Sequence, residues 1–262
     1  MDFTFFDAVI MGIIQGVTEF LPVSSSGHLA IAPHIFGFED PGLSYSVALH
    51  FGTLIAALIY FRRDLFDLSC MFFLRQKSSM GFSPSMPWLF LLATIPVVIA
   101  GFFVASPLEA SLRDPFLVSL FVVVSGGVLW FADRFSSRVR SLSDLSVPDA
   151  LIVGFSQMIA LLPGVSRSGA TMSAGLFLGF SRKDAARFSF LLSLPVIFGA
   201  TFFEFSTLLS SPFSWLILVG VGVSFIFSYF SIVFFLRLIE HIHYRIFFWY
   251  SLLLAVGVYF FA

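Results

Sequence analysis

The stretch FLPVSSSGHLA, residues 20–30, places three serines, a glycine and a histidine inside an otherwise apolar run. Hydrocarbon offers no partner for such groups or for a broken backbone, so irregular backbone at this depth is tolerated only inside protein or beside a water-filled cavity. A similar stretch, LLPGVSRSGAT, follows at residues 161–171 and adds an arginine. The two stretches therefore predict two interruptions of membrane-embedded helices.

The composition is that of a polytopic integral membrane protein. Of the 262 residues, 58% are hydrophobic and 11% charged, whereas soluble domains have roughly 25% charged residues. The acidic flank of the first apolar segment predicts a membrane segment rather than a removable signal peptide. The single cysteine, Cys70, excludes an internal disulfide framework and a cysteine metal site. The net charge of −1 points to no class of partner, and a nucleic-acid partner is not expected.

Six apolar stretches reach or approach the roughly 20 residues that a membrane-spanning helix needs. The basic residues gather in four of the segments between them, and the remaining two joints hold only Arg113. Because cytoplasmic loops are rich in Lys and Arg, these four loops are predicted to be cytoplasmic and both termini to lie outside. The predicted spans are 43–61, 86–105, 115–133, 188–205, 213–236 and 246–261, and the cytoplasmic loops are 62–85, 134–147, 181–187 and 237–245.

The two polar stretches are interpreted as re-entrant helical hairpins. Residues 148–180 begin and end beside basic loops, and the part from 170 to 180 is too short to cross a bilayer. This segment is therefore expected to enter from the cytoplasm, turn at PGVSRSG and return to the same side. The first stretch repeats it at an offset of 142 residues: Gln15, Val23, Ser24, Ser26 and Gly27 correspond to Gln157, Val165, Ser166, Ser168 and Gly169.

The predicted fold is all-α, with about six full transmembrane helices and two hairpins. An odd number of crossings separates the two copies, so the second has the opposite topology, as in inverted-repeat membrane proteins. Residues 1–262 form one membrane domain, with repeat 1 at about 1–133 and repeat 2 at about 146–262. Two alternatives stay open: chance similarity between two Ser/Gly turns, and a first segment, 3–20, that spans the bilayer fully before a loop.

Together the hairpins could bind an anion near the bilayer midplane. Each returning half-helix points its N-terminus, with unpaired N–H groups, at the turn, and hydroxyls and a glycine there suit a phosphate or diphosphate. Arg167 is the strongest candidate, because an arginine at the centre of a membrane helix costs about 2.5–3.5 kcal/mol and its planar fork fits two phosphate oxygens. The residues that start the half-helices are Ser24, Ser25, Ser26 and Gly27, and Ser166, Arg167, Ser168 and Gly169.

Titratable residues lie close to this predicted site. Gln15 and Glu19 are four residues apart and share one helical face before Pro22. The carboxylate could hold a divalent cation, orient a base, or only form an ion pair with Arg167 that joins the hairpins. His28 follows Ser25 by three residues and is interpreted as functional. In contrast, His50, which could line the same cavity or bond to its own helix, is interpreted as structural.

These motifs resemble those of the bacterial undecaprenyl-diphosphate phosphatases, the bacitracin-resistance family of polytopic membrane enzymes. The family's Glu/Gln-x-x-x-Glu and Pro-Val-Ser-Ser-x-Gly-His pattern matches QGVTEFLPVSSSGH at 15–28, and its Pro-Gly-x-Ser-Arg-Ser-Gly-x-Thr pattern matches PGVSRSGAT at 163–171. The stretches at 93–96 and 182–195 are also similar, so the resemblance covers nearly the whole chain. Gln15 stands where many members have Glu, which leaves the role of that position open.

The resemblance implies removal of the terminal phosphate from undecaprenyl diphosphate, which recycles the lipid carrier of cell-wall synthesis. It implies a site facing the outer side of the bacterial cytoplasmic membrane and a divalent cation, Mg²⁺ or Ca²⁺, held or positioned by Glu19 and Gln15. The remaining roles that it implies are Ser25 and His28 as nucleophile and activating partner, and Ser166, Arg167 and Thr171 as phosphate ligands. The expected partners are the polyprenyl substrate and membrane lipid, and a homodimer is an open alternative.

A transporter or flippase of a lipid phosphate or another anion is the alternative function, because broken helices in inverted repeats are a transporter architecture. Such a protein would need the anion site and Arg167 but would have no use for Ser25 and His28 beside a carboxylate. Two routes also stay open for hydrolysis: attack by Ser25 through a phosphoserine, and direct attack by water with His28 as base.

Overall fold

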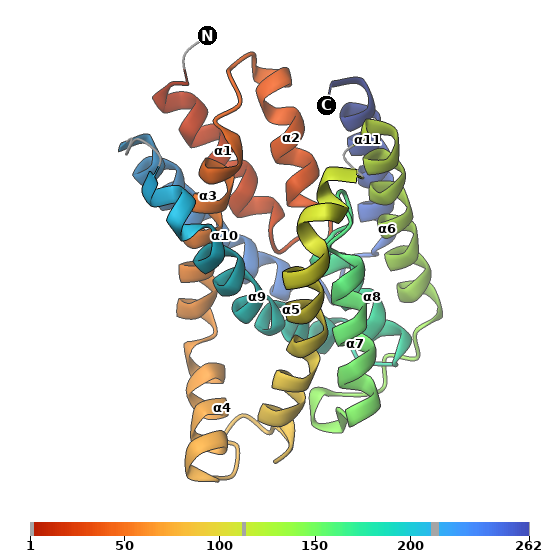
Figure 1. The fold of residues 1–262 in the computed structure, drawn as a ribbon. Helices are drawn as coiled ribbons and strands as arrows, with labels where there is room; N and C mark the ends of the chain where they lie inside the picture. Colours follow the sequence, from red (N-terminus) through yellow and green to blue (C-terminus); the bar gives the residue numbers. More distant parts are fainter. Residues whose placement is uncertain (1–2, 112–113, 211–214, 262) are drawn as a thin grey trace.

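A computed structural model describes the chain except residues 1–2, 112–113, 211–214 and 262 (Figure 1). The regular structure of the described residues is helical, which confirms the predicted all-α class. The α-helices are α1 (Phe5–Thr18), α2 (Ser25–Phe36), α3 (Gly42–Tyr60), α4 (Arg62–Leu74), α5 (Met86–Ser111), α6 (Pro115–Phe135), α7 (Val147–Ile159), α8 (Arg167–Phe177), α9 (Arg182–Ser210), α10 (Trp215–Leu238) and α11 (Arg245–Phe261).

Several of these helices are long and apolar enough to cross a membrane. α5, α6, α9 and α10 each meet the length and hydropathy requirements alone, and α3 meets them together with α4. α11 is apolar and has 17 residues, slightly fewer than a full span needs. The six predicted spans therefore correspond to α3, α5, α6, α9, α10 and α11, and the chain is a multi-pass membrane protein.

Residues 62–74, predicted as part of a loop, instead form α4. The chain bends by 71° between α3 and α4. On α4, the Asp64 carboxylate forms an ion pair with Arg187 of α9, and Asp67 accepts a hydrogen bond from the Ser79 amide at 2.8 Å. The prediction of a loop was wrong because a cluster of basic residues indicates on which side of a membrane a segment lies, not its backbone conformation.

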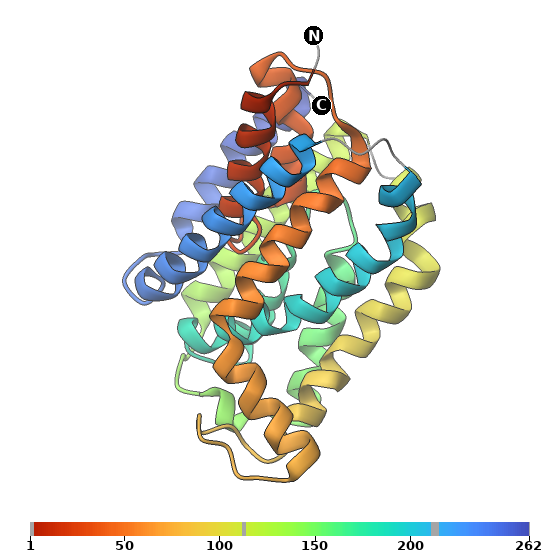
Figure 2. The same ribbon diagram turned by 90° about the vertical axis from the view of Figure 1, so that its left-hand side faces the viewer.

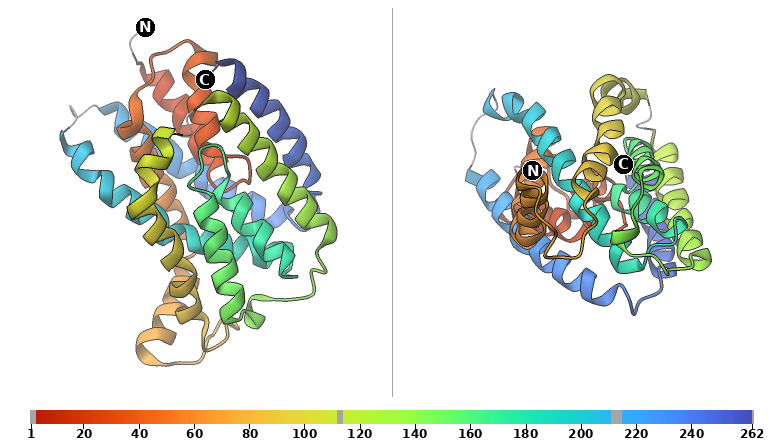
Figure 3. Two further views of the ribbon diagram at one scale, coloured as in Figure 1. Left: turned by 45° about the vertical axis from the view of Figure 1, so that its right-hand side comes forward. Right: turned by 90° about the horizontal axis from the view of Figure 1, so that it is seen from below.

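The two predicted hairpins are present. α1 has 14 residues, α2 12, α7 13 and α8 11. At 1.5 Å per residue the longest of them extends about 21 Å, less than the roughly 30 Å of a hydrocarbon core. This length excludes a full span for residues 3–20. The turns of the two hairpins lie side by side in the interior (Figure 3), where the Ser168 hydroxyl donates to the Leu21 carbonyl at 2.9 Å.

Each helix of the first hairpin packs against a helix of the second half, and each helix of the second hairpin packs against the equivalent helix of the first half. α1 packs along α10 and α7 along α5, while α2 contacts α11 and α8 contacts α6. Gly12 on α1 and Gly154 on α7, which are also 142 residues apart, explain this closeness. A Cβ at either glycine would lie 2.7 Å from a backbone oxygen of the partner helix, that of Gly220 or Ala93. This agrees with an inverted repeat, whose exact boundaries stay a prediction.

Buried ion pairs lie on the cytoplasmic side of the predicted topology, away from the termini. Figure 2 shows both termini at one end of the molecule and α4 at the other. Arg182 of α9 donates to both carboxylate oxygens of Asp133 on α6, at 2.7 and 2.8 Å. Its guanidinium also lies 5.3 Å from the ring centroid of Tyr244. These contacts join α6, α9 and the segment before α11.

Replacing Asp133 with alanine is expected to destabilise the protein by about 3–5 kcal/mol, because Arg182 would be left as a buried charge without its partner. The loss can be measured by thermal unfolding of the purified protein in detergent. Lys183→Ala is the matched control, since Lys183 and Glu240 are more than half exposed and 4.0 Å apart, and such pairs contribute about 1 kcal/mol or less. Equal stability of the two variants would contradict this role of Asp133.

Candidate active site

The repeated V-S-x-S-G pattern forms the beginning of α2 and of α8. The Ser24 hydroxyl accepts a hydrogen bond from the Gly27 amide at 3.4 Å, and the Ser166 hydroxyl accepts one from the Gly169 amide at 3.1 Å. Both serines are therefore N-caps, which satisfy one of the unpaired amides of a helix start. Ser24 and Ser166 thus lie at the starts of the half-helices, as predicted, and the motif repeats because the same helix start is built twice.

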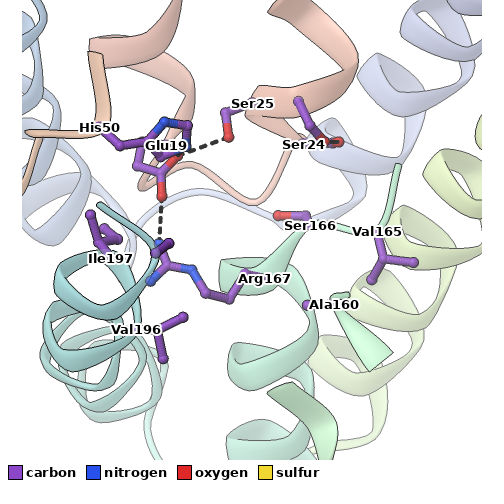
Figure 4. Close-up of a pocket in the computed structure, with 12 residues that line it drawn as sticks. Glu19, Ser24, Ser25, His50, Ala160, Val165, Ser166, Arg167, Val196 and Ile197 are labelled. Atoms are coloured by element: carbon purple, nitrogen blue, oxygen red, sulfur yellow. Dashed lines mark hydrogen bonds and ion pairs between the residues drawn. The ribbon is translucent and has the colours of Figure 1, made fainter. Parts of the chain in front are cut away.

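The carboxylate of Glu19 lies between the two helix starts (Figure 4) and is nearly buried, with 7% exposure. Its Oε1 accepts a hydrogen bond from Arg167 Nη2 at 2.7 Å, and the two side chains form an ion pair. Its Oε2 accepts hydrogen bonds from Ser25 Oγ at 2.8 Å and from Gln15 Nε2 at 2.9 Å. His50 Nε2 lies 3.5 Å from the same oxygen. Residues from both hairpins and from α3 thus meet at one carboxylate.

A cavity of about 200 Å³ adjoins this cluster. Arg167 is the arginine of its lining, and within the described part of the chain the buried Nη1 of Arg167 has no hydrogen-bond partner. A buried guanidinium nitrogen without an acceptor is costly, so this atom is suited to an anionic ligand. The lining comprises Glu19, Ser24, Ser25, Ser26, His50, Ala160, Val165, Ser166, Arg167, Val196, Ile197 and Ala200.

The other predicted ligands lie just outside this lining and support it. Thr171 contacts the Ser189 hydroxyl at 2.6 Å and donates to the Arg167 carbonyl at 2.9 Å, so its hydroxyl holds α8 against α9. Gly27 lines a neighbouring cavity. Gln15 donates to Glu19, the Ser168 hydroxyl donates to the Leu21 carbonyl, and the Gly169 amide donates to the Ser166 hydroxyl. The structure therefore places Ser24, Ser26 and Ser166 at the cavity, and leaves Thr171 in a packing position.

The expected contact between Ser25 and His28 is not formed. His28 Nδ1 lies 2.8 Å from the Ser24 carbonyl, and Nε2 lies 2.6 Å from the Tyr250 hydroxyl. The imidazole also stacks on the Tyr250 ring at 5.5 Å. A spacing of three residues brings Cβ atoms together on a helix, but here Ser25 points back to Glu19 while the imidazole turns toward α11. His28 therefore holds the turn and α11 in place.

His50, interpreted from sequence as structural, is the histidine that lines the cavity. Its Nδ1 lies 2.8 Å from the Ser46 carbonyl, and because a carbonyl only accepts, Nδ1 carries the proton. This leaves Nε2 directed at the Glu19 carboxylate. The sequence signal for His50 was available, since an ionisable residue within a membrane-spanning helix is a functional candidate by itself.

The Glu19 cluster does not fit a divalent cation held by the protein alone. In the described chain, no three or more His, Cys, Asp or Glu residues lie close enough to bind a metal ion. Both Glu19 oxygens already face donors, and Gln15 presents its amide nitrogen, not its oxygen, to Glu19 Oε2. Gln15 Oε1 is buried and unpaired in the described structure, but one free amide oxygen is a poor site for a cation that prefers several oxygen ligands.

Comparison with known proteins agrees with this arrangement. The family model described as bacitracin resistance protein BacA matches residues 8–257. An undecaprenyl-diphosphatase of Desulforudis audaxviator is 42% identical over 256 residues, which cover 97% of this chain and 96% of the relative. Relatives of the same name from Trichlorobacter lovleyi (41% identity; 96% and 94% covered) and Alcanivorax borkumensis (42%; 97% and 98% covered) are similar over comparable lengths. The resemblance inferred from the two motifs is confirmed, and the chain belongs to the bacitracin resistance protein BacA family.

Proposed function

We propose that this chain is a membrane phosphatase that hydrolyses undecaprenyl diphosphate to undecaprenyl phosphate and inorganic phosphate. Relatives that align over nearly the whole chain are undecaprenyl-diphosphatases. The structural observation that carries the proposal is the cavity in which the Ser25 hydroxyl, the Glu19 carboxylate and the unpaired nitrogen of Arg167 meet. A transporter would need Arg167 but has no use for a serine hydroxyl that is hydrogen-bonded to a carboxylate, so this alternative is not favoured.

Arg167 and the two helix starts would bind the terminal phosphate. Arg167 Nη2 is held by Glu19, which leaves Nη1 free for a phosphate oxygen. The N-termini of α2 and α8 each carry a partial positive charge of roughly half a unit, and both begin at the cavity. Ser24, Ser26 and Ser166 bring hydroxyls within the same lining.

Ser25 is the proposed nucleophile and Glu19 the proposed proton acceptor. The distance of 2.8 Å between Ser25 Oγ and Glu19 Oε2 lies within the range for a general base. Ser25 Oγ would bond to the terminal phosphorus while the bridging P–O bond breaks and undecaprenyl phosphate leaves. A water molecule would then attack the phosphorus of the phosphoserine, the Ser25 Oγ–P bond would break, and the proton held by Glu19 would return to Ser25 Oγ as phosphate is released. An aspartate that accepts the proton of an attacking hydroxyl in protein kinases is a chemical precedent.

A divalent cation stays a proposal. Mg²⁺ is usually bound through one or two carboxylates together with substrate phosphates, so a cation would arrive on the diphosphate rather than occupy a protein cage. It would offset phosphate charge when bound, and the steps assigned above to Ser25 and Glu19 do not depend on it.

The proposed location is the bacterial cytoplasmic membrane, with the basic loops inside and both termini outside. A single cysteine at Glu39 or at Ser143, in a Cys70→Ser background, tests this orientation with a membrane-impermeant maleimide on intact cells. Both positions are exposed, so Glu39→Cys is expected to react and Ser143→Cys to be protected until the cells are opened. Reaction of Ser143→Cys from outside would reverse the orientation.

Arg167→Lys is expected to fold but to lose about 100-fold or more in phosphate release from undecaprenyl diphosphate, because lysine cannot bond Glu19 and a phosphate oxygen with two fixed nitrogens. Release of inorganic phosphate by purified protein measures this, and wild-type release is also the test of the function itself. Normal turnover by Arg167→Lys would contradict a role in phosphate binding, and the role of Arg167 would then be only the ion pair with Glu19 that joins the hairpins.

Rapid quench with substrate labelled at the terminal phosphate is expected to trap label on wild-type protein and none on Ser25→Ala. His28→Ala should still form labelled protein, at a lower rate, because His28 holds the turn and does not take the proton. Substantial turnover by Ser25→Ala would show that water attacks directly. Label on Glu19→Gln but none on His28→Ala would return the role of base to His28.

A further inference from the structure

We propose that an apolar groove between α6, α7 and α8 binds the isoprenoid chain of the lipid substrate, an inference that rests on the function proposed above. The groove has a volume of about 520 Å³. α6 and α7 each pack against α8, so α8 forms the floor and the other two helices form the walls. Small residues of α8 that line the groove, Ala170 and Ala174, leave space above the floor.

The groove is suited to hydrocarbon. The Ser156 hydroxyl donates to the Val153 carbonyl at 2.7 Å, and the Ser173 hydroxyl donates to the Gly169 carbonyl at 2.6 Å. These two hydroxyls are therefore used within their own helices, as is common for serine in membrane helices. The apolar residues Val124, Val128, Ile152 and Phe177 also line the groove and are about half exposed, which opens it toward lipid.

The groove adjoins the catalytic cavity. Val165 lines both spaces, while Ile159 lines the groove and Ala160 the cavity, so the α7–α8 turn is the wall between them. Val165 directly precedes the N-cap Ser166. A ligand lying across Val165 would have its polar end beside Arg167 and its apolar part in the groove, which is the shape of a polyprenyl diphosphate.

The direction of the groove agrees with the orientation of a lipid. α8 runs from the central turn away from the end that carries both termini (Figures 1 and 3). A separate cavity of about 390 Å³ shares Ser26 and His50 with the catalytic cavity and reaches Gly42 and Pro115, at the starts of α3 and α6. A head group that enters from that side would leave its chain pointing along the groove. Because lipid is as apolar as the groove, the groove is expected to orient the chain more than to add hydrophobic free energy.

Val128→Trp tests this assignment by filling the groove from a residue of α6 that is 43% exposed. The matched control is Val256→Trp, 57% exposed, in an apolar hollow between α6 and α11 whose lining shares no residue with the catalytic cavity. Phosphate release is measured from undecaprenyl diphosphate and from geranyl diphosphate. Val128→Trp should raise KM for the long substrate about ten-fold, as expected for overpacking, and leave the short substrate and the control unchanged.

Photo-cross-linking gives a second readout that does not depend on turnover. A polyprenyl diphosphate with a diazirine on an isoprene unit near the head group should label residues 121–128 or 170–178 of the wild-type protein. Label confined to residues 252–260, or an unchanged KM in Val128→Trp, would overturn the groove assignment while wild-type phosphate release keeps the proposed function intact. Absence of phosphate release from either substrate by wild-type protein would instead contradict the proposed function.

Discussion

The rest of the structure depends on the hydrogen bonds and the ion pair of the buried Glu19 carboxylate. A charged carboxylate away from water is stable only when it is paired and hydrogen-bonded. Here Gln15 from α1, Ser25 from α2 and Arg167 from α8 donate to it, and His50 of α3 lies 3.5 Å away. These groups come together only when both hairpins and α3 are in place. The same contacts that satisfy the carboxylate therefore assemble the proposed active site.

The two halves of the chain share a scaffold but differ in chemistry. At the repeat offset, Ser25 and Arg167 are equivalent, because each is the first residue of its half-helix. One copy thus supplies a hydroxyl and the other a guanidinium, and both contact Glu19, which has a leucine, Leu161, as its equivalent. A symmetric pair of arginines would leave one charge without a carboxylate at membrane depth, which is costly. The asymmetry is therefore what makes a polar site tolerable in this position.

Much of this arrangement could be predicted from the sequence, because its determinants are local or depend on length. Residues 148–180 are flanked by basic loops and contain a half-helix too short to span a bilayer, which predicts a hairpin, and the repeat at an offset of 142 predicts the other hairpin and the residues that start both half-helices. The partner of Arg167 was also predictable, since Glu19 is a carboxylate within the other polar stretch. The contacts of His28 were not, because the direction of its side chain depends on distant residues. His28 is held by Tyr250, which is 222 residues away, and nothing in the local spacing indicates that contact.

The α7–α8 turn shows why a broken helix suits chemistry on a lipid diphosphate. An unbroken helix uses its own amides and presents none at mid-depth, whereas a helix that begins there directs unpaired N–H groups and a partial positive charge at a ligand. Gly164 permits this turn to pack tightly, because it has φ of +91° and a Cβ there would lie 2.5 Å from the Val118 carbonyl oxygen on α6. The turn can therefore lie with hydroxyls and Arg167 on one side and apolar side chains on the other. A substrate whose head cannot enter hydrocarbon and whose chain cannot leave it requires such a boundary, and an interrupted helix provides it inside the bilayer.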